Sequence, residues 1–288
     1  MADPQHTATA VVLTALPVEY DAVRNLLTDL TEREHPDGTR VEFGRLDGTA
    51  WHVAVAELGE GAVNAAALAS QIVGWLRPEV LLFVGVAGGL KDDVEIGDVV
   101  VGTKVYAFQG GKQTSDGFHA RPEVWHGSHR WVQAARSALR ELNDVRAHRK
   151  PIAVGDVVLA DDRSALADFI RRTYNDAYAI EMEGSGAAHA ALVNGSLDAL
   201  VIRGISDHAA PGKEEADASG SQELAAGQAA RVAVAVLRKQ QPRGGGSRDS
   251  EEGPHAGGRA DVYGGDHIDF RNGTFHAPVT GKRDERRG

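Results

Sequence analysis

The chain of 288 residues contains no cysteine, which excludes disulfides, thiolate metal sites, iron–sulfur clusters and a cysteine nucleophile. No run approaches the roughly 18 consecutive apolar residues that a membrane-spanning helix needs. The polar residues 1–10 lack the basic-then-apolar order of a secretory signal. Positive charge is also scarce, since 31 Lys and Arg stand against 41 Asp and Glu. These features predict a soluble, cytoplasmic protein that binds neither nucleic acid nor a membrane.

The composition changes near residue 242. Before this point apolar runs alternate with Ala-rich stretches, whereas eleven of the 34 glycines fall in the last 47 residues. Apolar area in this final stretch is too scarce to offset the entropy lost when a backbone is ordered. We therefore expect one folded domain over residues 8–241 and a flexible, Gly-rich tail over residues 242–288.

Residues 263–279 of this tail are less uniform than the rest. Ile268, Phe270 and Phe275 surround the pair Asn272-Gly273, which is a common hairpin turn. An isolated hairpin is only marginally stable in water, so one interpretation is a fluctuating hairpin. The other interpretation is a peptide that docks on a partner protein.

Short apolar runs alternate with helical patterns throughout the first 241 residues. The predicted strands are 10–16, 41–46, 51–58, 80–86, 98–105, 152–159, 178–182 and 199–205, and the predicted helices are 19–30, 61–76, 130–142, 164–173, 184–193 and 221–240. This alternation predicts an α/β fold, with a central, largely parallel or mixed β-sheet flanked by helices in a three-layer sandwich.

Three acidic residues stand where predicted strands end, namely Glu19, Glu183 and Asp207. Each has an ordinary structural interpretation, as an acid at a helix N-terminus or as a turn residue. Ligands of such sheets, however, bind where strands end and loops begin. If the sheet is continuous, the three carboxylates meet at one rim and predict a functional site there.

Four motifs carry a resemblance to a known family. They are Ala15-Leu16-Pro17-x-Glu19, Gly85-x-Ala87-Gly88-Gly89 with Gly97-Asp98 after it, Glu181-Met182-Glu183-Gly184, and Arg203-x-Ile205-Ser206-Asp207. Their order resembles the nucleoside phosphorylase superfamily, and most of all its methylthioadenosine/S-adenosylhomocysteine nucleosidase branch. The resemblance covers about residues 10–240. It implies a nucleoside phosphorylase-like fold, an N-glycosyl hydrolase, and no cofactor or metal.

The resemblance also implies roles for individual residues. Asp207 matches the acid that protonates N7 of a purine, and Glu19 matches the base that activates the attacking water. Glu183 matches the residue that binds the ribose hydroxyls, with Met182 packing on the sugar. Further substrate contacts are expected from Glu181, Val86, Ala87, Gly88, Val158, Leu159, Ser206 and Phe118.

The choice between water and phosphate depends on two other positions. Phosphorylases of this superfamily hold phosphate with an Arg and a Ser, where this chain has Phe83 and Val86. Neither side chain offers a donor to a phosphate dianion. We therefore expect a purine nucleosidase that hydrolyses the N-glycosidic bond of a nucleoside or nucleotide. A phosphate-dependent purine nucleoside phosphorylase and a non-catalytic nucleoside-binding module, which recruits a partner through its tail, remain as alternatives.

The segment 106–125 and the tail depart from the housekeeping enzymes. One interpretation of this segment is that it covers the base and that Lys112 and Arg121 reach a 5′-phosphate, and the other is a solvated loop or a subunit contact. Histidines at 119, 126 and 129 lack the spacing of a metal site. The resemblance implies a homodimer or higher homo-oligomer. By analogy, a nucleosidase with such a tail looks like an effector in bacterial signalling or defence.

Overall fold

A single mixed β-sheet organises the part of the chain that the computed structural model describes, residues 9–209 and 220–243. Its strands run in the order β11-β10-β6-β12-β5-β1-β4-β3-β2, and β9 pairs with β6. The strands are β1 (Thr9–Thr14), β2 (Thr28–Glu34), β3 (Arg40–Arg45), β4 (His52–Glu57), β5 (Val80–Gly89), β6 (Val99–Ala107), β7 (Gly111–Thr114), β8 (Gly117–Ala120), β9 (Glu123–His126), β10 (Ala147–Val154), β11 (Ala179–Glu181) and β12 (Asp198–Asp207).

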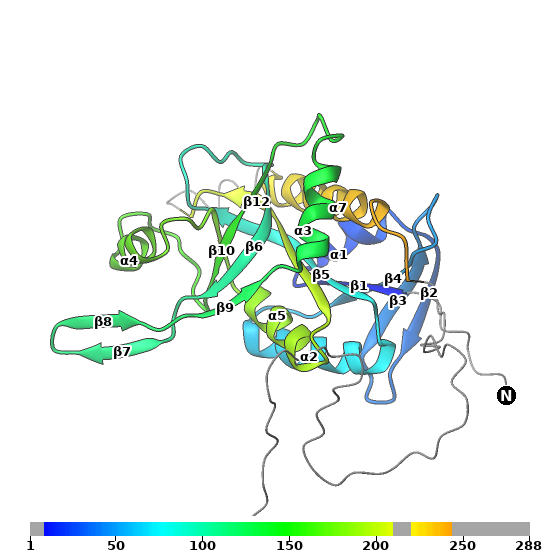
Figure 1. Cartoon of the computed structure of the whole chain (residues 1–288), viewed down its shortest axis with the longest axis horizontal. Helices are drawn as coiled ribbons and strands as arrows, with labels where there is room; N and C mark the ends of the chain where they lie inside the picture. The colour runs from blue at the N-terminus through cyan, green and yellow to red at the C-terminus, as the bar shows by residue number, and fades with distance from the viewer. Residues whose placement is uncertain (1–8, 210–219, 244–288) are drawn as a thin grey trace, which may run out of the picture. The chain divides into compact units, whose positions relative to one another are not determined.

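Helices cover both faces of this sheet (Figure 1). The helices are α1 (Pro17–Arg24), α2 (Ala62–Leu76), α3 (His129–Ala138), α4 (Ala165–Thr173), α5 (Gly184–Val193) and α7 (Ser221–Arg238). One core contains Val23 of α1, Trp131 of α3 and Val236 of α7, and the other contains Ile72 of α2 and Ala187 of α5. The predicted three-layer α/β sandwich with a mixed sheet is confirmed. No helix in the described ranges is both long and apolar enough to cross a membrane.

Five strands of the sheet close into a ring. The strand β11 pairs with β10 in parallel and with β5 in antiparallel orientation, and β6 and β12 complete the circuit. The strands β5 and β12 are buried along almost their whole length, as expected for strands covered on both faces. The ring therefore fixes the ends of β5, β11 and β12 against one another.

The helix predicted over residues 19–30 is wrong in its second half. The helix α1 ends at Arg24, and β2 begins at Thr28 and pairs with β3. Asp29 has a φ of +54°, a left-handed conformation that no helix interior accommodates. The apolar spacing that predicted one long helix instead places Leu27 and Leu30 against Gly44 of β3.

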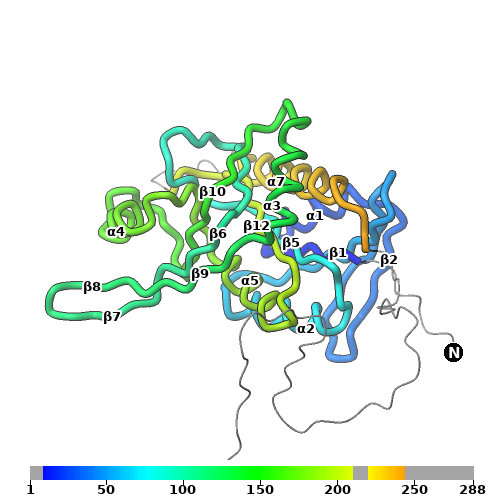
Figure 2. The backbone as a smooth tube through the Cα atoms, in the orientation of Figure 1, coloured from blue at the N-terminus to red at the C-terminus, as the bar shows by residue number. Residues whose placement is uncertain are grey.

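The segment expected to be a loop, residues 106–125, contains three short strands. The strand β9 extends the sheet at β6, with Val105 opposite Trp125. The strands β7 and β8 pair only with each other, and Figure 2 shows them running out from the sheet as an arm. The predicted hairpin at 263–279 lies outside the described residues, as do all but the first two residues of the predicted tail.

Candidate active site

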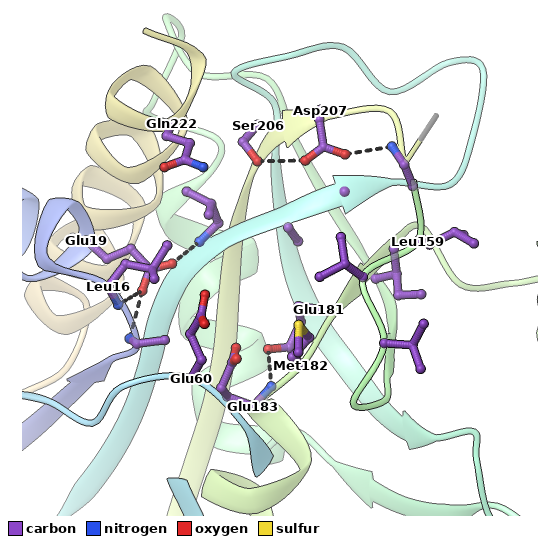
Figure 3. Close-up of a pocket in the computed structure, with 18 residues that line it drawn as sticks. Leu16, Glu19, Glu60, Leu159, Glu181, Met182, Glu183, Ser206, Asp207 and Gln222 are labelled. Atoms are coloured by element: carbon purple, nitrogen blue, oxygen red, sulfur yellow. Dashed lines mark hydrogen bonds between the residues drawn. The ribbon is translucent and has the colours of Figure 1, made fainter. Parts of the chain in front are cut away.

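A pocket lies where several strands of the sheet end (Figure 3). It is bordered by the loops after β1 and β4, the ends of β5, β11 and β12, the loop after β10 and the first turn of α7. The lining residues are Ala15, Leu16, Glu19, Glu60, Val86, Ala87, Gly88, Val157, Val158, Leu159, Ile180, Glu181, Met182, Glu183, Ser206, Asp207, Ala209 and Gln222. Every predicted site residue except Phe118 is in this set.

Strand register explains why residues so distant in sequence meet here. Gly88 of β5 lies opposite Asp207 on β12 and opposite Ile180 on β11. On its other side β5 runs parallel to β1, with Phe83 opposite Leu13. The chain segments that follow β1, β11 and β12 therefore all leave the sheet beside the Gly-rich end of β5.

Glu19 is held firmly in place and is only 2% exposed. Its Oε2 accepts hydrogen bonds from the amides of Ala15 (2.8 Å) and Leu16 (3.0 Å), and its Oε1 accepts one from the amide of Val86 (2.7 Å). The structural interpretation of Glu19 as an acid at a helix N-terminus is thus also correct, because this carboxylate caps α1. Burial raises the pKa of Glu19, although nearby Arg203 and the three amides oppose the rise.

Beneath the pocket lies a buried ion pair. Arg203 is fully buried, and its Nη2 lies 2.5 Å from Oε2 of Glu181. Glu181 also accepts hydrogen bonds from the amides of Glu183 and Gly184, at the start of α5. The Arg203 guanidinium lies over the Phe83 ring, 4.1 Å from the ring centroid. Glu181, predicted as a substrate contact, is therefore engaged mainly with the protein.

Glu183 differs from Glu19 and Glu181, which accept hydrogen bonds from amides at the starts of α1 and α5. It occupies the N-cap position of α5 but makes no capping hydrogen bond. Instead its Oε1 accepts one from the amide of Gly61 at 3.1 Å, and its Oε2 lies 4.0 Å from Nη2 of Arg203. Burial and the charge of Glu181 raise the pKa of Glu183 to about 7. Its carboxyl group is therefore able to change protonation state near neutral pH.

Asp207 ends β12 and is buried at the opposite side of the pocket. Its Oδ1 accepts a hydrogen bond from the amide of Ala209 at 2.7 Å, and its Oδ2 accepts one from the Ser206 hydroxyl at 3.1 Å. The structural interpretation of Asp207 as a turn residue is also correct, since the hydrogen bond from the Ala209 amide to its Oδ1 is that of an Asx turn. These bonds fix the direction in which the carboxyl group faces the pocket.

Gly85 allows the charged groups to approach one another. A Cβ atom at this position would lie 2.1 Å from Nη1 of Arg203 and 2.3 Å from Oε1 of Glu19. Such contacts are far shorter than van der Waals distances, so any side chain here would displace both groups. The second motif therefore needs this glycine for space.

The remaining lining is mainly apolar and lies beside Asp207. Val157, Val158 and Leu159 follow β10, and Met182 follows β11. Val158 is 56% exposed, although it lines the pocket. These side chains form walls suited to the faces of a flat ring system.

Phe118 does not line the pocket of its own chain, contrary to the expectation that it contacts the substrate. It lies on β8, and its ring meets that of Phe169 on α4 edge-on, at 5.4 Å between centroids. The strands β7 and β8 pair as a hairpin, and Figure 1 shows this hairpin running out from the sheet. Lys112 and Arg121 are likewise absent from the lining.

Sequence reasoning assigned no role to three residues at or beneath the pocket: Arg203, Glu60 and Gln222. A single arginine inside an apolar strand was the available signal for the first of these. The other two carry no sequence signal, because they lie in a loop and in the first turn of a helix. Across residues 9–209 and 220–243, no three His, Asp or Glu side chains are grouped to hold a metal ion.

Comparisons with known proteins identify the family of this chain. A family model described as "Phosphorylase superfamily" matches residues 9–238. The chain is 32% identical over 178 residues to a 5′-methylthioadenosine/S-adenosylhomocysteine nucleosidase of Anoxybacillus flavithermus. The matched region covers 59% of this chain and 72% of that protein.

Two solved structures show a similar fold. The nucleosidase of the same description from Neisseria meningitidis, in complex with methylthio-immucillin-A, has a TM-score of 0.71 at 22% identity, over 81% of this chain and 99% of that one. The futalosine hydrolase of Helicobacter pylori has a TM-score of 0.72 at 21% identity, with the same coverage of both chains. The family match and the related sequence together show that this chain belongs to the phosphorylase superfamily, as an N-glycosyl hydrolase of the nucleosidase type.

Proposed function

We propose that this protein hydrolyses the N-glycosidic bond of a purine nucleoside in the pocket described above. The observation that carries the proposal is the meeting of Glu19, Glu183 and Asp207, from three different strand ends, in one pocket with apolar walls. Cleavage of this bond needs an acid for the leaving base, a base for the water and a group that binds the sugar. The three carboxyl groups match these needs one to one.

In the proposed reaction the base lies between the apolar walls beside Asp207. The Asp207 carboxyl group donates a proton to N7 as the C1′–N9 bond breaks, so the purine leaves as a neutral base. The Glu19 carboxylate takes a proton from the water whose oxygen bonds to C1′. Glu183 accepts hydrogen bonds from the ribose hydroxyls, and Met182 packs on the sugar. The products are a free purine and a free sugar.

Two features of Glu19 suit it to the role of base. Its three amide hydrogen bonds fix the carboxylate, so little reorganisation is needed when the water is deprotonated. Burial raises its pKa, and a group with a higher pKa is a stronger base once ionised.

Water is favoured over phosphate by the charge of the lining. Among the described residues that line the pocket, five are acidic and none is Lys, Arg or His. Phe83 is buried beneath the Arg203 guanidinium, and that guanidinium is already paired with Glu181. A phosphate dianion beside these carboxylates would lack the donors that such anions require.

Product analysis tests this proposal directly. We expect adenosine to yield adenine and ribose in phosphate-free buffer, with ¹⁸O from labelled water at C1 of the sugar. A reaction that needs added phosphate and yields ribose 1-phosphate would identify a phosphorylase. A protein that binds purine nucleosides in calorimetry and forms no product would identify a binding module.

We also propose that the protein is cytoplasmic and forms a homo-oligomer. Val63 on α2, Val124 on β9, and Leu192 and Val193 on α5 are exposed apolar side chains on neighbouring elements, since α5 packs against α2 and β9. We propose that a second copy covers this face in a homodimer, and that the tail is available to a protein partner. Sedimentation analysis should show a dimer, and Leu192→Glu should shift it toward a monomer.

A further inference from the structure

One end of the pocket is not used by the roles proposed above. Leu16, Glu60 and Gln222 continue the lining on the side away from Asp207 and Leu159, as Figure 3 shows. In a nucleoside whose base lies at Asp207, the 5′ substituent is carried by C4′ and extends past the sugar, beyond the part of the pocket that the base occupies. This end of the pocket, which we call the 5′ end, therefore receives the 5′ substituent. The inference rests on the proposed function and concerns which nucleosides the site accepts.

The backbone fixes the position of Glu60. It stands between Gly59 and Gly61, whose φ angles of +74° and +96° favour glycine. The Gly61 amide donates to Oε1 of Glu183, and the Asn64 side chain donates to the Leu58 carbonyl. The loop that carries Glu60 is thus joined to the proposed sugar-binding carboxylate, so that Glu60 keeps its place beside the sugar.

The described residues of this chain offer no cation at the 5′ end to an anionic substituent. Glu60 adds a carboxylate to the four other acids of the lining, and Gln222 is neutral. Arg203 is fully buried and paired with Glu181, so it does not face a substrate at this end. Lys112 and Arg121 do not line the pocket. A 5′-phosphate would meet like charge here and leave its oxygens without donors.

We propose that Glu60, together with Gln222, selects nucleosides whose 5′ substituent donates hydrogen bonds, either a hydroxyl or an ammonium group, and rejects 5′-phosphates. A carboxylate accepts hydrogen bonds only, whereas the amide of Gln222 both donates and accepts. A 5′-ammonium group gains charge attraction in addition. A methylthio group offers Glu60 no donor. The substrates are therefore nucleosides rather than nucleotides.

Four adenine compounds test the proposal in the full-length chain: 5′-amino-5′-deoxyadenosine, adenosine, 5′-methylthioadenosine and AMP. We expect kcat/KM to fall in that order. In Glu60→Gln the preference for the amine over adenosine should shrink by about 3–10-fold, which is the effect of one partly solvated charge. In Glu60→Lys the value for AMP should rise relative to that for adenosine. Glu57→Gln removes a nearby exposed charge that does not line the pocket, and should leave these ratios unchanged.

The outcomes separate this inference from the proposed function. If adenosine is cleaved but AMP is cleaved equally well, or if neither Glu60 variant moves the ratios, the selection by Glu60 is refuted and hydrolysis stands. If no compound is cleaved, the proposed function fails, and calorimetric binding of the same four compounds tests Glu60 independently. Weaker binding of AMP than of adenosine, reversed in Glu60→Lys, supports the inference, and equal binding refutes it.

Discussion

The rim of strand ends and the β7–β8 hairpin differ in how firmly the rest of the protein fixes them. At the rim, Glu19, Glu183 and Asp207 are each less than 9% exposed and accept hydrogen bonds from backbone amides. The hairpin pairs only with itself, and Phe118 is 41% exposed. Substitutions at the rim should therefore have large effects, and substitutions in the hairpin small ones.

The largest effect is expected from Asp207→Asn. This change removes the proposed acid and keeps the shape of the side chain, so kcat should fall by about 10²–10⁴-fold while nucleoside binding persists. Turnover of adenosine and calorimetric binding measure the two effects, and circular dichroism verifies the fold. Wild-type turnover in this variant would show that Asp207 is not the acid.

The next largest effect is expected from Gly85→Ala. Its Cβ would displace both Arg203 and Glu19, so we expect a loss of about 1–3 kcal/mol in the free energy of unfolding, together with a loss of activity. Gly74→Ala is the matched control. A Cβ added at this position in α2 would have no atom within 4 Å, and alanine favours a helix interior over glycine. Denaturant unfolding compares the two variants, and equal stabilities would refute the packing argument.

The pKa of Glu183 leads to a pH effect on stability. In the unfolded chain this group loses its proton near its ordinary pKa of 4.5, and in the folded protein it does so near 7. Between these values the folded state binds more protons, so the free energy of unfolding should fall as pH rises. Urea unfolding from pH 4.5 to 7.5 should show this decline in the wild type and a shallower one in Glu183→Gln. If the free energy of unfolding depends on pH in the same way in both proteins, the folded protein does not raise this pKa.

A smaller effect is expected from Phe118→Ala. The side chain is half-exposed and makes one edge-on ring contact with Phe169, so its loss should lower the free energy of unfolding by less than about 1 kcal/mol. Thermal unfolding measures this change. A loss as large as that in Gly85→Ala would mean that the hairpin is fixed as firmly as the rim.

The smallest effect is expected when the chain is ended at Gln241. This truncation keeps α7 and the hydrogen bonds from the Trp51 indole to the carbonyls of Leu237 (3.0 Å) and Gln240 (2.9 Å). The melting temperature should change by no more than about 2 °C, and the nucleosidase rate should be retained. A large drop would show that residues beyond 241 belong to the fold.

The features predicted well from the sequence are those that several signals describe at once. The alternation of apolar runs with helical patterns predicted the sandwich. Acids at three predicted strand ends, together with the nearly all-apolar run of β5 that ends in glycines, predicted that Glu19, Glu183 and Asp207 would meet at one rim. Their individual roles came from the family resemblance and remain proposals.

Features that depend on tertiary contacts were not predicted. The spacing of Leu27 and Leu30 suits a helix or a strand, and pairing with β3 decides between them. The role of Arg203 depends on its pairing with Glu181, which no local pattern in the sequence indicates. Glu60 lies in a loop, so only the fold reveals that it borders the pocket. The sequence does not show in which direction a hairpin extends from the sheet, so it did not reveal that Phe118 lies outside the pocket lining of its own chain.

The closed strand ring has a consequence for synthesis on the ribosome. The strand β5 emerges early and pairs with β1, but β12, which pairs along the opposite edge of β5, begins only at Asp198, after β6 to β11 have been made. Proteolysis of ribosome-arrested chains should therefore find the region of β5 accessible until β12 has left the exit tunnel. Until then the nascent chain presents the unpaired edge of its most apolar strand, which other unfinished chains can join. Cells that make this protein quickly should accordingly depend on chaperones that bind nascent chains.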